Sequence, residues 1–226
     1  MIYGINDGHC LTGKGTGAVG YKNETDMNRL VGKRLRTMLK ESGHSAIDCT
    51  VDKSNNDLAD IVTLANKQYL DLFISLHLNC FSDKNANGVE TFSYAKSGKG
   101  HEYAVKIQNE LVSSIGWKNR GKKEANFYVL RNTNASAVLI ELGFCSNKED
   151  MDKWDTEKIC RAIFKAITGA NYIPKQQTNS TTTSNVYRVF VDGKQRGTAY
   201  ANHKNILGMV ETALKNNATI IEVKKK

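Results

Sequence analysis

The chain has 226 residues, of which 40% are hydrophobic and 24% are charged, and its formal net charge is +9. These values are typical of a soluble globular protein with one sizeable core and room for an appendage. No apolar run approaches the roughly 18 residues that a membrane helix needs, so we expect no membrane insertion.

Strand and helix patterns alternate along residues 1–170. Short apolar runs typical of strands lie at 2–5, 44–51, 71–78, 88–94, 127–130 and 136–144. Apolar residues at helical spacing lie between and after them at 25–42, 57–69, 101–115 and 156–170. This alternation predicts an α/β domain of three layers, in which helices flank a mostly parallel six-stranded sheet.

A domain boundary is predicted after the only proline, Pro174. Residues 175–185 are polar and rich in Ser, Thr, Asn and Gln, which is typical of a flexible linker. Residues 186–226 then predict two strands around a tight turn, a helix and a last strand, in the order β-β-α-β. A segment of about 40 residues has a small core, so we expect a homodimer or docking to stabilise this α+β module.

The positive charge is concentrated in the C-terminal segment. Residues 186–226 hold 8 Lys/Arg and 3 Asp/Glu, a net of +5, whereas residues 1–174 hold 23 and 20, a net of +3. A compact basic module favours an anionic partner, which leaves nucleic acid, a membrane surface and an acidic polymer open.

The five cysteines include no CxxC pair, and an odd number without such spacing favours reduced thiols over a disulfide framework. Cys10 and Cys80 each follow closely after a histidine. A bridge between these two cysteines, or a contact of either with a metal ion, therefore stays open.

Residues of metal-binding or acid–base type fall at the ends of predicted strands, where open α/β sheets bind their ligands. They are His9, His77 and Glu141, after or late in the first, third and last strands. A glycine-rich loop before the first helix can bring Glu24 to the same edge. Two histidines and a carboxylate can hold one zinc ion (Zn2+) with water in the fourth position, and a second carboxylate can take the proton of that water.

Each of these residues also has a plainer interpretation. A histidine at a strand end is often a satisfied polar residue, and Glu24 could simply favour the start of a helix. Glu141 is the strongest candidate, because a carboxylate inside the apolar run VLIELGF costs several kcal/mol to bury without a partner or a task.

Six motifs resemble those of the zinc-dependent N-acetylmuramoyl-L-alanine amidases of the amidase-3 type, and they occur in that family's order. They are INDGHC at 5–10, NET at 23–25, SLHLN at 75–79, GVETF at 88–92, FYVLRNT at 127–133 and VLIELGFCSNKED at 138–150. The resemblance implies a catalytic domain at 1–174 that cleaves peptidoglycan between the lactyl group of N-acetylmuramic acid and L-alanine. It also implies zinc ligands at His9, Glu24 and His77, and a zinc-bound water activated by Glu141 as general base and acid.

The chain departs from the family's pattern without losing any of these residues. Asp7 and Cys10 replace a usual proline and glycine in the first motif, and Leu78 and Cys80 stand where small residues are common. Asn79 and Arg131 lie beside motifs and are predicted to bind substrate, Arg131 through a peptide carboxylate. For both of these, an ordinary surface or turn role is equally consistent with the sequence.

A wall-lytic domain with a small second domain and no recognisable secretory signal resembles a bacteriophage endolysin of a Gram-positive, clostridial-like host. Such a protein stays in the host cytoplasm until it is released to the cell wall. Residues 186–226 would then be a cell-wall-binding module for anionic wall polymers. A host autolysin fits the same features.

Two other functions are consistent with parts of this sequence. A zinc carboxypeptidase or other peptidase acting on the stem peptides of the wall would use the same residue types. A non-enzymatic nucleic-acid-binding protein could use the aromatic and basic residues of the C-terminal hairpin, among them Tyr187, Arg188 and Phe190. The second alternative leaves Glu141 and both strand-end histidines unexplained, so we expect no nucleic-acid partner.

Overall fold

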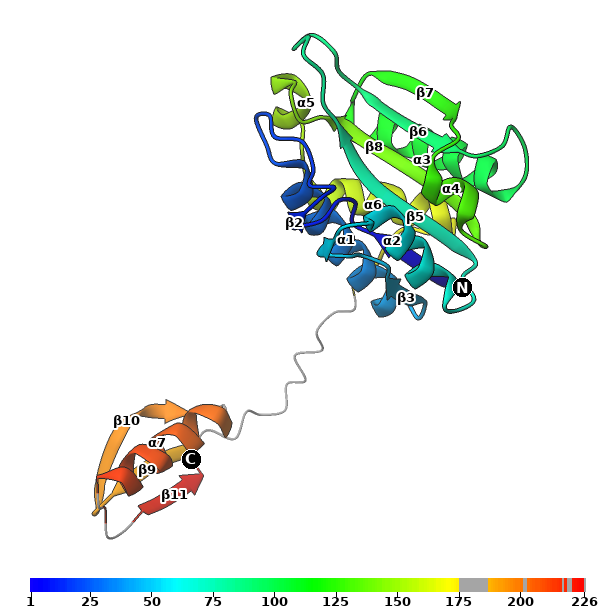
Figure 1. Ribbon diagram of the computed structural model, residues 1–226. Coiled ribbons are helices and arrows are strands. Elements are labelled where there is room, and N and C mark those ends of the chain that lie inside the picture. Colours follow the sequence, from blue (N-terminus) through cyan, green and yellow to red (C-terminus); the bar gives the residue numbers. More distant parts are fainter. Residues whose placement is uncertain (175–186, 201–202, 217, 219–220, 226) are drawn as a thin grey trace. The chain divides into compact units, whose positions relative to one another are not determined.

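The computed structural model describes residues 1–174, 187–200, 203–216, 218 and 221–225. The chain divides into two compact units, Met1–Pro174 and Lys175–Lys226 (Figure 1). The predicted linker at 175–185 lies outside the described residues. Among the described helices, none is both long and apolar enough to span a lipid bilayer.

The first unit is built on a six-stranded sheet with the order β3-β1-β5-β8-β6-β7. The strands are β1 (Ile2–Asn6), β3 (Ser45–Asp48), β5 (Leu72–Asn79), β6 (Val89–Ser93), β7 (Asn119–Glu124) and β8 (Ser136–Phe144). β3, β1, β5 and β8 are parallel, β6 runs antiparallel to β8, and β7 is parallel to β6. The predicted mostly parallel α/β fold is therefore confirmed. The short strands β2 (Thr12–Gly13) and β4 (Lys53–Ser54) form a separate pair.

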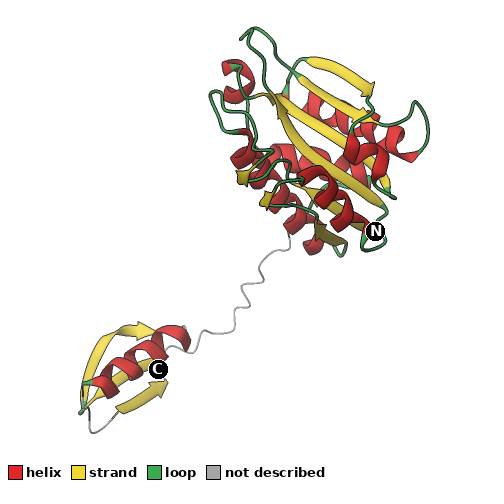
Figure 2. Cartoon of the chain, in the orientation of Figure 1, coloured by secondary structure: helices red, strands yellow, loops and turns green. Residues whose placement is uncertain are grey.

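Helices cover both faces of this sheet and give it three layers (Figure 2). One face carries α1 (Glu24–Glu41), α3 (Lys99–Ile115) and α6 (Thr156–Thr168). The other carries α2 (Asp57–Asn66) and the short α4 (Tyr128–Asn132). A further short helix, α5 (Lys148–Asp152), follows β8.

The sequence prediction is wrong at one strand and misses another. The aromatic and β-branched residues at 127–130 predict a strand, but α4 begins at Tyr128 and packs against α2. The sixth strand is instead β7, with the sequence NRGKKE. It lies at the edge of the sheet, where charged side chains discourage pairing with other chains, so it has none of the apolar alternation that identifies a strand.

The two central strands, β5 and β8, supply cores on both faces. Leu72, Ile74 and Leu76 of β5 are fully buried in the larger core, against α1, α3 and α6. Phe73, between them, is fully buried in the smaller core with α2 and α4. Because both faces are packed, the carboxyl ends of these strands are held in place, and that is where the candidate site lies.

Asp7, which stands where the family's pattern has a proline, ties the end of β1 to α1. Its side chain is 1% exposed and accepts two hydrogen bonds from Arg36, at 2.5 and 2.9 Å. The helix approaches closely at Gly32, where a Cβ atom would lie 1.6 Å from Asp7 Oδ1, so only glycine fits there.

Breaking this ion pair is expected to destabilise the first unit. Arg36→Met leaves the Asp7 charge buried without its partner, and we expect the free energy of unfolding to fall by about 3–5 kcal/mol. Both tryptophans, Trp117 and Trp154, lie in this unit, so urea unfolding followed by tryptophan fluorescence measures it directly. Lys148→Met, which removes an exposed pair with Asp152, is the control and should shift the unfolding midpoint far less. Equal unfolding midpoints for the two variants would contradict the expectation.

The second unit has the predicted order of elements. It contains β9 (Tyr187–Val191), β10 (Lys194–Tyr200), α7 (His203–Lys215) and β11 (Ile221–Lys225). The sheet order is β10-β9-β11, and both pairings are antiparallel. Asp192 and Gly193 both have positive φ angles, 48° and 76°, as a tight two-residue hairpin turn requires.

Candidate active site

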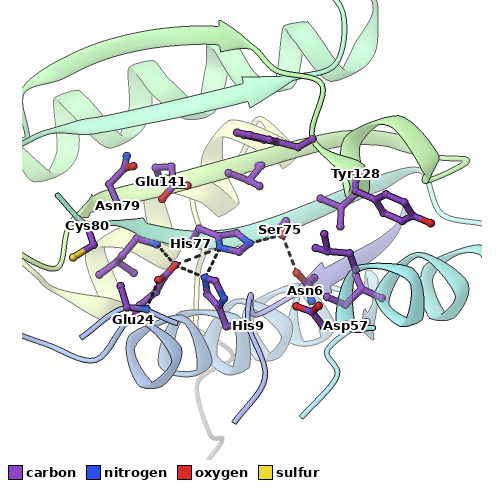
Figure 3. Close-up of a pocket in the computed structure, with 17 residues that line it drawn as sticks. Asn6, His9, Glu24, Asp57, Ser75, His77, Asn79, Cys80, Tyr128 and Glu141 are labelled. Carbon is purple, nitrogen blue, oxygen red and sulfur yellow. Dashed lines mark hydrogen bonds and ion pairs between the residues drawn. The ribbon is translucent and has the colours of Figure 1, made fainter. Parts of the chain in front are cut away.

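The fold brings the four residues predicted for catalysis to one edge of the sheet (Figure 3). His9 follows β1, Glu24 is the first residue of α1, His77 lies near the end of β5 and Glu141 lies in β8. Since β1, β5 and β8 are parallel neighbours, their carboxyl ends meet at this edge. All four side chains line one cavity of about 350 Å³.

Three of them form a tight cluster. His9 Nε2 lies 2.9 Å from Glu24 Oε1, and His77 Nδ1 lies 3.3 Å from the same oxygen. The two ring nitrogens are 3.2 Å apart. One ligand atom from each residue therefore lies within 4.8 Å of the others, which is close enough to share one ion.

The hydrogen bonds around the two imidazoles determine which ring nitrogens carry hydrogen. His9 Nδ1 lies 3.0 Å from the carbonyl oxygen of Gly15, which can only accept, so Nδ1 donates, and in the neutral ring that a metal binds Nε2 has the free lone pair. Ser75 donates its hydroxyl to Asn6 Oδ1 at 2.8 Å and therefore accepts from His77 Nε2 at 3.1 Å. His77 Nδ1 then also has a free lone pair.

The carboxylate of Glu24 is held from both sides. Its Oε1 accepts the backbone N–H of Leu78 at 3.0 Å, and its Oε2 accepts that of Ala18 at 2.9 Å. Burial acts to raise the pKa of Glu24. In the metal-free chain, hydrogen bonds and charge interactions with His77 and His9, which require a hydrogen on the ring nitrogen facing Glu24, outweigh burial and hold this pKa well below its usual range. Glu24 is therefore ionised.

This set of donor atoms fits a metal ion. Two imidazole lone pairs and an ionised oxygen point at one place, and three acceptors at this spacing repel one another unless a cation lies among them. Burial lowers the pKa of His77, which favours the neutral imidazole that a metal binds. His9, Glu24 and His77 can thus hold one metal ion, with Ser75 and Asn6 orienting the second histidine.

Glu141 faces the cluster without joining it. It is the direct neighbour of His77 in the β5–β8 register, and its Oε2 atom is buried without a hydrogen-bond partner among the described residues. Burial raises the pKa of Glu141 to about 8, and the negative charges of Glu24 and Glu90 act in the same direction. A carboxyl group that exchanges its proton near neutral pH can serve as both acid and base.

The raised pKa of Glu141 predicts a pH-dependent stability of the metal-free protein. Below the unfolded value of 4.5 the group is neutral in both states. Between 4.5 and about 8 only the unfolded chain ionises, so stability falls as the pH rises, and above about 8 the full cost is present. Glu141→Gln removes this cost. We expect it to raise the free energy of unfolding by roughly 4 kcal/mol at about pH 8.5 and to change little at about pH 4. Urea unfolding with chelator present measures both values, and an equal effect at the two pH values would contradict the shift.

The two predicted substrate residues are placed differently. Asn79 lines the cavity beside Glu141, whereas Arg131 does not line it. Arg131 lies on α4, with its guanidinium 5.7 Å from the ring centre of Tyr128, and Tyr128 does line the cavity.

The open question about the cysteines is also resolved in part. All five thiols are free, and neither Cys10 nor Cys80 belongs to the metal-binding group found among the described residues. Cys80 has Cys145 as its thiol neighbour, because the backbone N–H of Cys145 bonds to the carbonyl oxygen of Asn79 at 2.8 Å across β5 and β8. The arrangement therefore gives no support to a bridge between Cys10 and Cys80.

Sequence reasoning missed the polar residues that support the site. Asn6 and Ser75 lie opposite each other in the β1–β5 register and are both buried. A polar residue inside an otherwise apolar strand was the available signal. Glu90, a buried carboxylate in the motif GVETF, carries the same signal.

Comparison with known proteins identifies the family of this chain. The sequence pattern of the N-acetylmuramoyl-L-alanine amidase family matches residues 4–170, which include the whole cluster and Glu141. The chain belongs to the N-acetylmuramoyl-L-alanine amidase family. The resemblance noted in the motifs is thereby confirmed.

This amidase-family chain is similar to proteins of clostridia and of a Bacillus phage. The catalytic domain of the CD27L endolysin, which targets Clostridia difficile, has a TM-score of 0.69 and 33% identity, covering 76% of this chain and 98% of that one. The endolysin of Bacillus phage SPP1 is 32% identical over 154 residues, covering 65% and 55%. An uncharacterised protein of Clostridium perfringens is 38% identical over 156 residues, covering 67% and 46%, so the match spans about half of that relative's length.

Proposed function

We propose that this chain hydrolyses the amide bond between the lactyl group of N-acetylmuramic acid and L-alanine in peptidoglycan. The observation that carries the proposal is the convergence on one cavity of two imidazoles, one ionised carboxylate and Glu141, whose buried Oε2 has no hydrogen-bond partner in the described part of the chain. Membership of the amidase family supports the choice of bond.

We propose zinc as the metal, held by His9, Glu24 and His77. Two histidines and one carboxylate form a ligand set that catalytic zinc sites use, with one position left for water or substrate. When bound, zinc supplies Lewis acidity, which polarises the scissile carbonyl and makes water a nucleophile near neutral pH. The chain itself orients these ligands through Gly15, Ser75 and the two backbone N–H groups at Glu24.

Glu141 carries the proton in this proposal. It takes a proton from the attacking water and gives one to the nitrogen of L-alanine as that nitrogen leaves. Its position opposite His77 places it beside the ligand cluster, and its raised pKa suits both transfers. Asn79, inside the cavity, would contact the substrate, and Arg131 would meet a stem-peptide carboxylate from α4.

We further propose that the chain acts as an endolysin, which remains in the cytoplasm of its Gram-positive host until its release to the wall. The likeness to two endolysins supports this assignment. The basic second unit would bind anionic wall polymers. Cosedimentation of the full chain with intact walls and with walls stripped of these polymers tests the second role, since equal binding to both would exclude it.

The products of wall digestion test the main proposal. Purified peptidoglycan incubated with the protein should yield intact stem peptides with a free L-alanine amino group, identified by mass spectrometry. Shortened stem peptides still attached to the glycan would instead identify a peptidase. Undigested walls in the presence of zinc would reject both activities.

A further inference from the structure

A buried carboxylate that the proposed mechanism does not use lies next to the site. Glu90 of β6 is 5% exposed and stands opposite Glu141 in the β6–β8 register. It accepts hydrogen bonds from three side chains: Asn79 Nδ2 at 2.8 Å, Arg120 Nε at 3.0 Å and the ammonium group of Lys123. Asn79 is the one partner that also lines the cavity.

The contact with Glu90 determines how Asn79 faces the cavity. Burial acts to raise the pKa of Glu90, but hydrogen bonds from Lys123, Arg120 and Asn79 outweigh it and lower the pKa, so the group is ionised. An ionised carboxylate only accepts hydrogen bonds, so Asn79 must turn its NH2 group toward Glu90. The carbonyl oxygen of the Asn79 amide is then left as an acceptor, at the end of the cavity where Glu141 also lies (Figure 3).

We propose that Glu90 is a positioning residue, which turns the Asn79 amide so that its Oδ1 accepts an amide N–H of the substrate beside the scissile bond. The inference rests on the proposed amidase function, because an amide substrate brings an N–H group to the place where an ester would bring none. If Glu90 only stabilised its ion pairs with Arg120 and Lys123, the effect of replacing it on kcat/KM would not depend on Asn79.

Exchanging the amide at position 79 and the carboxylate at position 90 tests the proposal directly. Asn79→Asp places two carboxylates against each other and removes the hydrogen bond that orients residue 79. Adding Glu90→Gln supplies an NH2 group to the new carboxylate, so that an acceptor again faces the cavity. On a soluble muramoyl peptide with zinc present, we expect Asn79→Asp to lower kcat/KM about a hundredfold, and the double variant to recover at least about tenfold of that loss, which corresponds to one hydrogen bond. Unfolding midpoints and zinc content are measured for each variant.

A double-mutant cycle with Glu90→Gln and Asn79→Ala tests the inference if the exchanged pair fails to fold. If Glu90 acts through Asn79, Glu90→Gln should lower kcat/KM about tenfold in the native chain and cause no further loss in Asn79→Ala. Glu157→Gln is the matched control, because Glu157 also accepts hydrogen bonds from two basic side chains, Arg34 and Arg161, but does not line the cavity. It should leave kcat/KM unchanged.

The outcomes distinguish a failure of the proposed amidase function from a failure of the role proposed for Glu90. A native chain that releases no peptide with a free L-alanine amino group refutes the proposed function. Two results with an active native chain overturn the role of Glu90: a double variant no better than Asn79→Asp, or a Glu90→Gln loss as large in the Asn79→Ala variant as in the native chain. Recovery in the exchanged pair, or loss of the Glu90 effect in Asn79→Ala, supports it.

Discussion

Glu141→Gln is expected to lower kcat for amide hydrolysis by about 10²- to 10⁴-fold, the range that a positioned general acid and base contributes. The substitution preserves the shape of the side chain and removes its ability to exchange a proton. Because Glu141 is not one of the three clustered ligands, bound zinc should be retained. The measurement is the initial rate of release of L-alanine amino groups from peptidoglycan, with the zinc content determined on the same samples.

Glu157→Gln is again the control, since it makes the same change in charge on α6, outside the cavity. It should keep the native rate. A Glu141→Gln variant that retains zinc and at least half of the native rate would show that another group transfers the proton.

Removal of the metal is expected to abolish hydrolysis, and zinc added back should restore it. The same site should couple to stability, because an ion that binds only the folded state stabilises it by about 4 kcal/mol at a thousand times its dissociation constant. Zinc should therefore raise the unfolding midpoint of the native chain. It should raise that of His77→Ala far less, because only His9 and Glu24 of the cluster remain.

Cys80→Ser provides the control for the metal experiment. Cys80 lines the cavity and thiolate is a good zinc ligand, but its thiol lies outside the metal-binding group of the described residues. The variant should show the native zinc-dependent shift in unfolding midpoint. A smaller shift would mean that the thiol is a ligand, and an equal shift in His77→Ala and the native chain would place the metal elsewhere.

Much of the fold follows from local patterns in the sequence. The alternation of apolar strands with helices predicts the layered α/β domain, because strands buried on both faces need continuous apolar side chains. The pattern fails at residues 127–130 and at β7. The first has strand-forming residues but packs as a helix against α2, and the second is an edge strand whose side chains need not be apolar.

Some features of the candidate site can also be predicted from the sequence, and others cannot. His9, His77 and Glu141 could be picked out because each is a polar residue at or near the end of an apolar strand, and such ends meet at one edge of a parallel sheet. The orienting contacts could not, because they join residues far apart in the sequence. Asn6 and Ser75 are 69 residues apart, and Glu24 meets His77 over a separation of 53.

The sequence by itself therefore determined which side chains stand at the ends of which strands, since that depends on periodicity over a few residues. Only the tertiary structure decided which ring nitrogen of each histidine is free, which way the Asn79 amide faces and how strongly Glu141 holds its proton. These properties depend on burial and on neighbours that the fold brings close from distant parts of the sequence, where hydrogen bonds and charges act most strongly.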